Sequence, residues 1–375
     1  MFFLLLFLIG FRPFLSSLAF PFIDFLYSYA FIGLAILFIF QRKGTFLTYT
    51  KLSLFVYAFL ISLSLSACLG LNFRNSIAQL YKFIFLFFVY LFIRNLNEKE
   101  KRKVIRILII SSLLVGIYSL YYLFFAAGDL LNTLKALRIN YPFAFEFLKR
   151  RRTFIPFVLP SVLSCYLAIM LSITGYYIFS LKESKRNTVL LMSIFLIPMS
   201  LSFFLTKSIS GILSLFLAWI AASLMSRAPR RKLLPLILAA VIITAFIYLI
   251  RTVNSADFAS AGFSFGRRII YWKEALSYIL KHPFRPAGPG NYWGSYSQYV
   301  HNSYLQVWVE AGLLGIISLA GIIYTSVKNI LRNGSAWNKL IFPACLVFLF
   351  HNLFDFSFFL PEVSFIWWII LAMTE

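Results

Sequence analysis

The stretch that decides how this chain is arranged runs from Gly266 to Gly315 and reads GRRIIYWKEALSYILKHPFRPAGPGNYWGSYSQYVHNSYLQVWVEAGLLG. It holds the longest part of the sequence that is too polar for a bilayer interior. Its first half is rich in cations, its middle is a Pro/Gly run over 283–290, and His301 and Asn302 stand directly before the next apolar segment. We expect apolar helices to hold this stretch over a cavity at one membrane face, where its cations would meet an anionic substrate.

The composition around that stretch is typical of a polytopic membrane protein. Of the 375 residues, 61% are hydrophobic and only 13% are charged, whereas a soluble domain is about 25% charged. Apolar runs of membrane-spanning length recur from the first residues to the last. We therefore predict an all-α fold, a single membrane domain over residues 1–375, with a large outward loop at 251–302.

Segment length and loop charge together predict about twelve crossings. They are 2–20, 24–40, 52–71, 76–93, 104–126, 154–179, 188–206, 209–225, 233–250, 303–327, 340–356 and 358–373. The strongly basic short connections are separated from one another by even numbers of these spans. One topology therefore places all of them, and both termini, in the cytoplasm.

The net charge of +23 is large for a chain with so few charged residues. Cytoplasmic loops that collect Lys and Arg account for part of it, and an anionic substrate is a candidate for the rest. Nucleic acid is a poor candidate partner because the chain has no soluble basic domain. Cys68, Cys165 and Cys345 lie far apart without metal-ligand spacing, so we interpret them as packing residues.

Two outward connections carry cations against the topological rule. The connection 127–152 ends in four consecutive cations, Lys149, Arg150, Arg151 and Arg152, and the 251–302 loop contains Arg267 and Arg268 among others. Cations placed against the charge bias indicate a functional demand. The alternative for the first cluster is that its side chains reach toward lipid headgroups.

Lys207 is a further candidate, because it lies in the short connection Thr-Lys-Ser-Ile-Ser-Gly between two apolar spans. A helix entrance flanked by hydroxyls can bind an anion through its backbone N–H groups. The alternative is a capped helix start with a surface lysine.

Within the large loop, residues 267–281 have the pattern of an amphipathic helix lying on the membrane surface. His282-Pro283 ends that helix, and the following Pro/Gly run predicts a tight turn that positions its neighbours. It lacks the Lys-Ser/Thr and the preceding strand of a phosphate loop.

Three polar residues lie in or beside the last apolar spans. Glu310 is nine residues beyond His301, so the two do not share a helix face, and an acid at that depth needs a partner. His351 and Asp355 are four apart and share a face. They would form either a second polar element of the same cavity or a local pair within the bundle.

These residues resemble the O-antigen ligase and O-antigen polymerase superfamily of bacterial envelope proteins. The resemblance is carried by Arg268-x-x-x-Trp272, His282-Pro283-Phe284, Gly288-Pro289-Gly290, His301-Asn302-x-Tyr304, Glu310-x-Gly312-x-x-Gly315 and His351-Asn352. These motifs cover most of residues 200–375, whereas the first half of the chain agrees only in hydropathy.

The resemblance implies a glycosyltransferase of the bacterial inner membrane with its active site facing the periplasm. Its donor would be a glycan linked to undecaprenyl diphosphate, and its acceptor a hydroxyl of the lipid A core or of another glycan. Arg268 would hold the diphosphate, and His301 would act as general base on the acceptor hydroxyl. We expect transfer without a metal or cofactor and with inversion at the anomeric carbon, in contact with membrane lipids and without nucleic acid.

The remaining candidates are residues that would contact the diphosphate or the acceptor. They are Arg267, Lys207, Arg150, Arg151, Arg152, Trp272, Asn302, Tyr304, Glu310 and His351. The family often has Ser-Arg-Gly/Ala at the outward end of a mid-chain span, where this chain has Thr206-Lys207-Ser208. Either Lys207 replaces that arginine as a point charge, or the second phosphate contact comes from Arg150–Arg152 or Arg267.

Two other functions are compatible with parts of the sequence. A Wzy-type polymerase would use the same donor with a lipid-linked acceptor, and the sequence discriminates poorly between it and a ligase. A lipid-linked glycan transporter would be expected to show internal repeats and several charges buried within spans. No clear repeat is visible, and charges such as Lys82 and Glu310 are few, so an enzyme is the favoured interpretation.

Overall fold

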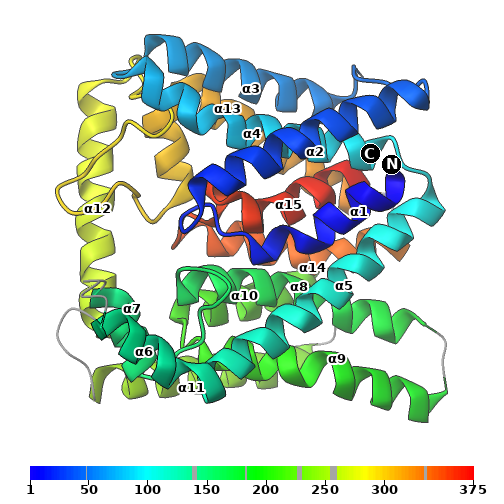
Figure 1. The fold of residues 1–375 in the computed structure, drawn as a ribbon, viewed down its shortest axis with the longest axis vertical. Coiled ribbons are helices and arrows are strands. Elements are labelled where there is room, and N and C mark those ends of the chain that lie inside the picture. Colours follow the sequence, from blue (N-terminus) through cyan, green and yellow to red (C-terminus); the bar gives the residue numbers. More distant parts are fainter. Residues whose placement is uncertain (48, 137–141, 182–183, 226–229, 254–259, 333–335) are drawn as a thin grey trace.

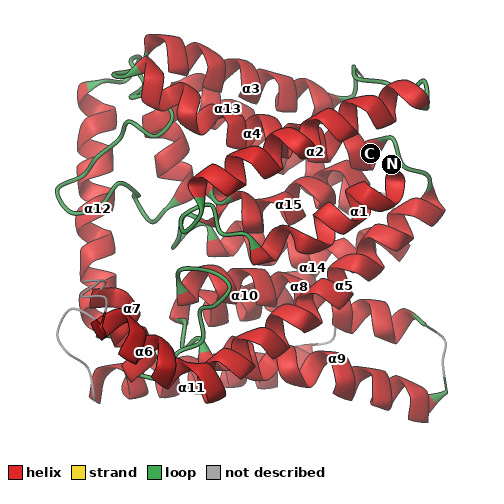
Figure 2. Cartoon of the chain, in the orientation of Figure 1, coloured by secondary structure: helices red, strands yellow, loops and turns green. Residues whose placement is uncertain are grey.

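The computed structural model describes residues 1–375 except 48, 137–141, 182–183, 226–229, 254–259 and 333–335, and these described residues form helices and loops without a strand (Figure 2). The predicted all-α fold is confirmed. The α-helices are α1 (Phe2–Phe11), α2 (Pro21–Gln41), α3 (Lys51–Leu69), α4 (Phe73–Arg94), α5 (Glu98–Tyr121), α6 (Ala127–Ala136), α7 (Pro142–Lys149), α8 (Pro160–Ser180), α9 (Lys185–Leu205), α10 (Ile209–Met225), α11 (Arg230–Val253), α12 (Ala261–Lys281), α13 (Ser303–Arg332), α14 (Ala336–His351) and α15 (Pro361–Met373).

Several of these helices have the length and composition of membrane spans. Within the described residues, eight qualify: Pro21–Gln41, Lys51–Leu69, Phe73–Arg94, Glu98–Thr133, Pro160–Ser180, Lys185–Leu205, Leu234–Thr252 and Ser303–Arg332. Four further apolar helices have 10–17 residues, which are Phe2–Phe14, Ile209–Met225, Trp337–His351 and Pro361–Met373. The chain is therefore a multi-pass membrane protein, and the count of about twelve crossings stays a prediction.

Most helices run side by side, whereas α12 runs across their ends, and both termini lie at the opposite end (Figure 1). We call these two ends the α12 end and the termini end. Side-chain contacts tie the basic connections together at the termini end. Arg42 pairs with Glu100 at 2.6 Å, and the Tyr90 hydroxyl donates to Glu375 at 2.8 Å. Two of the connections predicted to be cytoplasmic, those at Arg42 and at 94–106, therefore lie together near the C-terminus.

The connections predicted to face outward meet at the α12 end. The Leu71 N–H donates to the Ala287 carbonyl at 2.8 Å, joining the α3–α4 turn to the large loop. The Ser303 N–H donates to the Asn352 carbonyl at 2.9 Å, joining the start of α13 to the end of α14. This sorting of connections agrees with the predicted topology, while the side of the membrane that each end faces remains part of the proposal.

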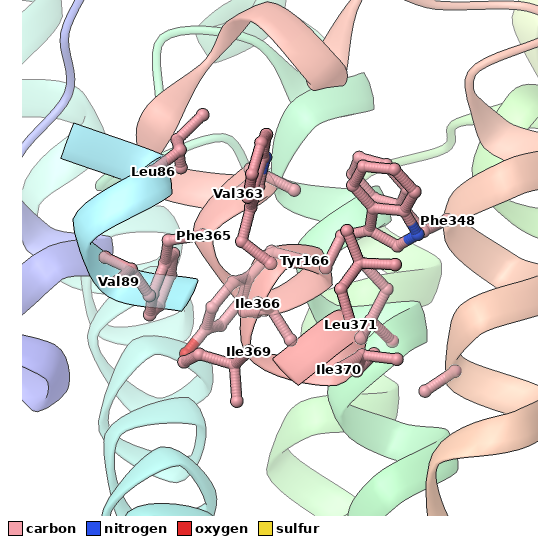
Figure 3. Close-up of a cluster of buried hydrophobic side chains, with 14 of the residues drawn as sticks. Leu86, Val89, Tyr166, Phe348, Val363, Phe365, Ile366, Ile369, Ile370 and Leu371 are labelled. Carbon is pink, nitrogen blue, oxygen red and sulfur yellow. The ribbon is translucent and has the colours of Figure 1, made fainter. Parts of the chain in front are cut away.

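The core of the bundle is built around α15, whose residues are all buried. Its Val363, Ile366 and Ile370 pack in one cluster with side chains of α4, α8 and α14 (Figure 3). A helix that is apolar on every side is stable only where other helices surround it. This explains how so short a helix occupies the centre of the protein.

The large loop is shaped by a break in α13. Gly312 has φ +71° and ψ −167°, which interrupts the helix and leaves preceding carbonyls without helical partners. The Ala287 N–H donates to the Val309 carbonyl at 2.9 Å, and the Gly288 N–H donates to the Glu310 carbonyl at 3.2 Å. The Pro/Gly turn therefore supplies the hydrogen bonds that the broken helix lacks, which anchors the loop to the bundle.

Several predicted boundaries differ from the structure, and two of them have a clear local cause. The amphipathic helix begins at Ala261 rather than at 267, because Ser260 caps it by accepting a hydrogen bond from the Phe263 N–H at 3.1 Å. The span predicted over 154–179 begins only at Pro160, because a proline is accepted readily in the first helical turn. The preceding residues instead form non-helical backbone at the α12 end.

A buried cluster of charges fastens α2 and α15 to the segment after α1. The Arg12 guanidinium lies 2.5 Å from Asp24 and 3.7 Å from Glu362, and the side chains of Arg12 and Asp24 are completely buried. The Tyr81 hydroxyl also donates to Asp24 at 2.7 Å. The two acids therefore compensate one buried guanidinium at the α12 end.

Replacing Arg12 with methionine is expected to destabilise the fold by about 3–5 kcal/mol, because it removes the guanidinium that pairs with the buried Asp24 and approaches Glu362. Denaturant unfolding in detergent measures the loss. Arg42→Met is the matched control, because Arg42 pairs with Glu100 while 41% of its side chain is exposed. Such a pair contributes about 1 kcal/mol or less. Equal losses in the two variants would show that the buried cluster has no special role.

Candidate active site

A cavity of about 410 Å³ lies at the α12 end of the bundle. Its walls come from α7, the starts of α8 and α10, the last turn of α11, the first half of α12 and the segment 296–301. These elements are far apart in the sequence but meet because α12 crosses the ends of the other helices (Figure 1). The volume lies in the range typical of small-molecule sites.

Four arginines line this cavity: Arg152, Arg251, Arg267 and Arg268. Arg152 follows α7, Arg251 lies in the last turn of α11, and Arg267 and Arg268 are neighbours in α12. Burial, together with the positive charges of Arg251 and Arg150, lowers the pKa of Arg152 well below its ordinary value. Gathering like charges at a partly buried site is unfavourable unless an anion joins them, so the cavity is suited to a phosphate-bearing ligand.

Two of these arginines are held in place by neighbouring residues. Arg152 donates from Nε to the Thr206 carbonyl at 2.9 Å, and its guanidinium lies 5.0 Å from the ring centroid of Phe147. The Arg267 guanidinium lies 4.0 Å from the ring centroid of Tyr296. Cation–π contacts leave the edge N–H groups of a guanidinium available as donors. Both side chains are therefore positioned at the cavity without being neutralised by these contacts.

His301 lies at the cavity wall in a fixed orientation. Its backbone is left-handed, with φ +55°, and its ring stacks on Tyr271 at 5.6 Å and meets Phe356 edge-on at 4.9 Å between centroids. One quarter of the side chain is exposed. Burial lowers the pKa of His301 to about 4, despite the opposing effect of Asp355. At neutral pH the imidazole is therefore uncharged and able to accept a proton.

Asp355 connects His301 with Arg268. One carboxylate oxygen lies 3.9 Å from His301 Nδ1, and the other lies 3.9 Å from an Arg268 terminal nitrogen. The Asp355 side chain is completely buried, and the Phe356 N–H donates to it at 2.8 Å. Because Nδ1 faces this acid, Nε2 is the His301 nitrogen available to a hydroxyl in the cavity.

Three predicted contact residues hold the site together instead of lining the cavity. The Trp272 indole donates to the His301 carbonyl at 3.3 Å. The Asn302 side chain caps α13 by accepting from the N–H groups of Tyr304 and Leu305 at 3.0 and 3.1 Å. The Tyr304 hydroxyl donates to the Leu349 carbonyl at 2.7 Å. Each therefore fixes the backbone that presents His301.

Three other predicted cations lie near Arg152 but do not line the cavity. Lys207 Nζ donates to the Arg150 carbonyl at 2.8 Å, and burial with the nearby arginines lowers the pKa of Lys207. Arg150 forms an ion pair with Glu146, and Arg151 is exposed. Of this cluster, Arg152 is the residue that the structure places at the cavity.

Glu310 and His351 lie apart from the cavity lining. Glu310 accepts a hydrogen bond from the Gln306 side chain at 2.6 Å and borders a small separate pocket together with Lys82. His351 is completely buried and has its Nδ1 3.3 Å from the Ser357 hydroxyl. His351 is thus a local element of the bundle behind Asp355.

Sequence reasoning did not select Arg251 or the tyrosines at 271 and 296 as site residues, and it considered Asp355 only as part of a polar pair with His351. Arg251 directly follows the predicted span 233–250 and is the first residue of the predicted loop 251–302, so its outward position was the signal available. Asp355 was paired with His351 by helical spacing, but α14 ends at His351 and the chain then turns toward His301. Within the described ranges, no group of three or more His, Cys, Asp and Glu side chains could hold a metal ion.

A helical membrane bundle with an arginine-lined cavity and an uncharged histidine is suited to chemistry on an anionic, membrane-borne substrate. Residues 194–320 match the family model described as O-antigen ligase, Wzy_C, which confirms the resemblance to the O-antigen ligase and polymerase superfamily. The matched segment includes Arg251, Arg267, Arg268 and His301. No curated protein matches the chain. At family level, the match supports a membrane glycosyltransferase of the O-antigen ligase or Wzy type.

Proposed function

We propose that this protein transfers a glycan from undecaprenyl diphosphate to an acceptor hydroxyl, with a sugar of the lipid A core as the favoured acceptor. The proposal rests on one observation. A single cavity is lined by four arginines and a histidine, which are Arg152, Arg251, Arg267, Arg268 and His301. Three of these arginines and the histidine lie inside the segment that matches the ligase family. The site would face the periplasm of the bacterial inner membrane, with both termini in the cytoplasm.

The arginines supply what the leaving group needs. As the bond between the anomeric carbon and the diphosphate oxygen breaks, negative charge grows on the diphosphate. Guanidinium groups bind phosphate oxygens through paired N–H donors and stabilise that charge where water is scarce. Arg268 is best placed for this role, because the acidic side chain that it approaches, Asp355, lies at 3.9 Å, beyond hydrogen-bond distance.

His301 supplies the base. In a single displacement, the acceptor oxygen bonds to the anomeric carbon, the diphosphate departs with the bonding electron pair, and the hydroxyl proton passes to His301 Nε2. Asp355 near Nδ1 stabilises the imidazolium that results. A single displacement inverts the anomeric configuration, and no step in this scheme calls on a metal.

The acceptor is tested by supplying purified protein in proteoliposomes with an undecaprenyl-diphosphate glycan and one of two acceptors, lipid A core or a second lipid-linked glycan. Product on the lipid A core, with inverted linkage and unaffected by EDTA, is the expected result. Chain growth on the lipid-linked glycan would instead identify a polymerase. Binding of the donor without transfer to either acceptor would contradict the proposed enzyme and favour a transporter.

The rate of transfer is expected to depend on pH through His301. Because the pKa of His301 lies near 4, the neutral base predominates above about pH 5. The kcat/KM of transfer should therefore stay constant between about pH 6 and 8 and fall only as the pH approaches 4 and His301 becomes protonated. Measured rates across that range check this, and a decline that begins near the ordinary histidine pKa of about 6.5 would contradict it.

A further inference from the structure

A second cavity, of about 260 Å³, lies at the termini end of the bundle. It is formed by the first turns of α5, the last turn of α8 and the start of α14. We call it the termini-end cavity. It is distinct from the candidate active site, because the two cavities share no lining residue and lie toward opposite ends of the helices.

Two arginines on one face of α5 line the termini-end cavity. Arg102 and Arg106 are four residues apart, so their side chains lie one above the other. Arg106 donates from Nε to the Tyr177 hydroxyl at 2.9 Å, which fixes the plane of its guanidinium. An arginine that only extends into water or toward bulk lipid headgroups does not require a hydrogen bond to another side chain of the protein. The terminal N–H groups of both guanidiniums remain suited to phosphate oxygens.

The rest of the wall is aromatic and apolar. Tyr176, Tyr177 and Trp337 line the cavity together with Leu181 and Leu340. The Trp337 indole donates to Glu98, and Glu98 in turn lies 3.5 Å from Lys101, so the nearby acid is already engaged. Aromatic side chains beside cations are typical of the level where lipid headgroups meet acyl chains.

We propose that the termini-end cavity binds the phosphate of an anionic phospholipid headgroup, with the two arginines on the phosphate and the apolar wall against the first part of the acyl chains. Basic pockets between membrane helices recognise such headgroups. A free phosphate would satisfy the arginines equally well but would leave the aromatic and leucine wall without a partner.

The test is a native mass spectrometry titration of the detergent-purified protein with phosphatidylglycerol, with phosphatidylcholine and inorganic phosphate as comparison ligands. Wild type is expected to bind one phosphatidylglycerol at least ten times more tightly than Arg102→Ala/Arg106→Ala. Arg102→Lys/Arg106→Lys, which keeps the charges, should retain part of the affinity. Inorganic phosphate at millimolar concentration should not displace the lipid.

Lys99→Ala/Lys185→Ala is the matched control, because it removes the same charge from two exposed lysines that do not line the cavity. Its affinity for phosphatidylglycerol should equal that of wild type. Equal binding by wild type and the arginine double variant would overturn the proposal, as would equal loss in the control. Displacement by inorganic phosphate would overturn the assignment to a lipid. If the alanine variant does not fold, the affinity of wild type for phosphatidylglycerol is compared with that of the lysine variant instead.

Discussion

Replacing Arg268 with alanine is expected to lower glycan transfer by about 10²–10³-fold, the loss typical of removing one group that stabilises charge in a transition state. Arg268 is the α12 arginine that both lines the cavity and approaches Asp355, so its loss would remove the proposed phosphate contact and leave the buried acid without this cation beside it. Arg268→Lys should be intermediate, because it keeps the charge but loses the paired donors. Initial rates in proteoliposomes measure both effects.

Arg285→Ala is the control for this experiment. Arg285 belongs to the same large loop, but it is exposed and lies outside the cavity lining, so its removal should change the rate only slightly. If Arg285→Ala were as damaging as Arg268→Ala, general charge on the loop rather than a phosphate contact would explain the requirement. Elution of the Arg268 variants as monodisperse protein would exclude misfolding as the cause of their loss.

Replacing His301 with alanine is expected to lower the kcat of transfer by about 10²–10⁴-fold, the usual contribution of a general base. Donor binding should persist, because the proposed phosphate contacts are made by the arginines and not by His301. The comparison of transfer rates with donor affinity in the same preparation therefore separates the two roles. A variant that lost donor affinity and retained its maximal rate would show that His301 binds the substrate and does not take the proton.

The chain provides a control for the histidine as well. His282 lies in the same loop, is exposed, and packs beside Tyr278 at 4.9 Å between ring centroids. His282→Ala should transfer glycan at nearly the wild-type rate. Unchanged activity in His301→Ala would show that His301 is not the general base.

The fold was predictable from sequence because its main determinants are local. Apolar run length predicts helices that can cross a bilayer, and loop charge predicts two groups of connections, of which the contacts at Arg42–Glu100 and Leu71–Ala287 each join members of one group. Helix ends were harder to predict, since they depend on caps such as Ser260 and on prolines such as Pro160. The central position of α15 depends on packing among α4, α8 and α14, which no local pattern specifies.

The site was predictable only in part. Arg152 and Arg267 were selected as cations in outward connections, Arg268 and His301 mainly through the family resemblance, and all four line the cavity. Lys207 was selected from a short connection between spans and Glu310 as an acid within a span, but both have partners elsewhere. Whether a cation reaches a cavity depends on the direction of its side chain after folding. Asp355 approaches His301 only because the chain turns where α14 ends.

The central claim is that the arginine-lined cavity receives the diphosphate of the donor. A structure of the protein bound to an uncleavable undecaprenyl-diphosphate glycan tests it directly. The account predicts that the diphosphate lies in this cavity, within hydrogen-bond distance of Arg268 and of at least one of Arg152, Arg251 and Arg267, with the anomeric carbon facing His301. A diphosphate bound elsewhere, or bound in this cavity without contact to Arg268, would contradict it.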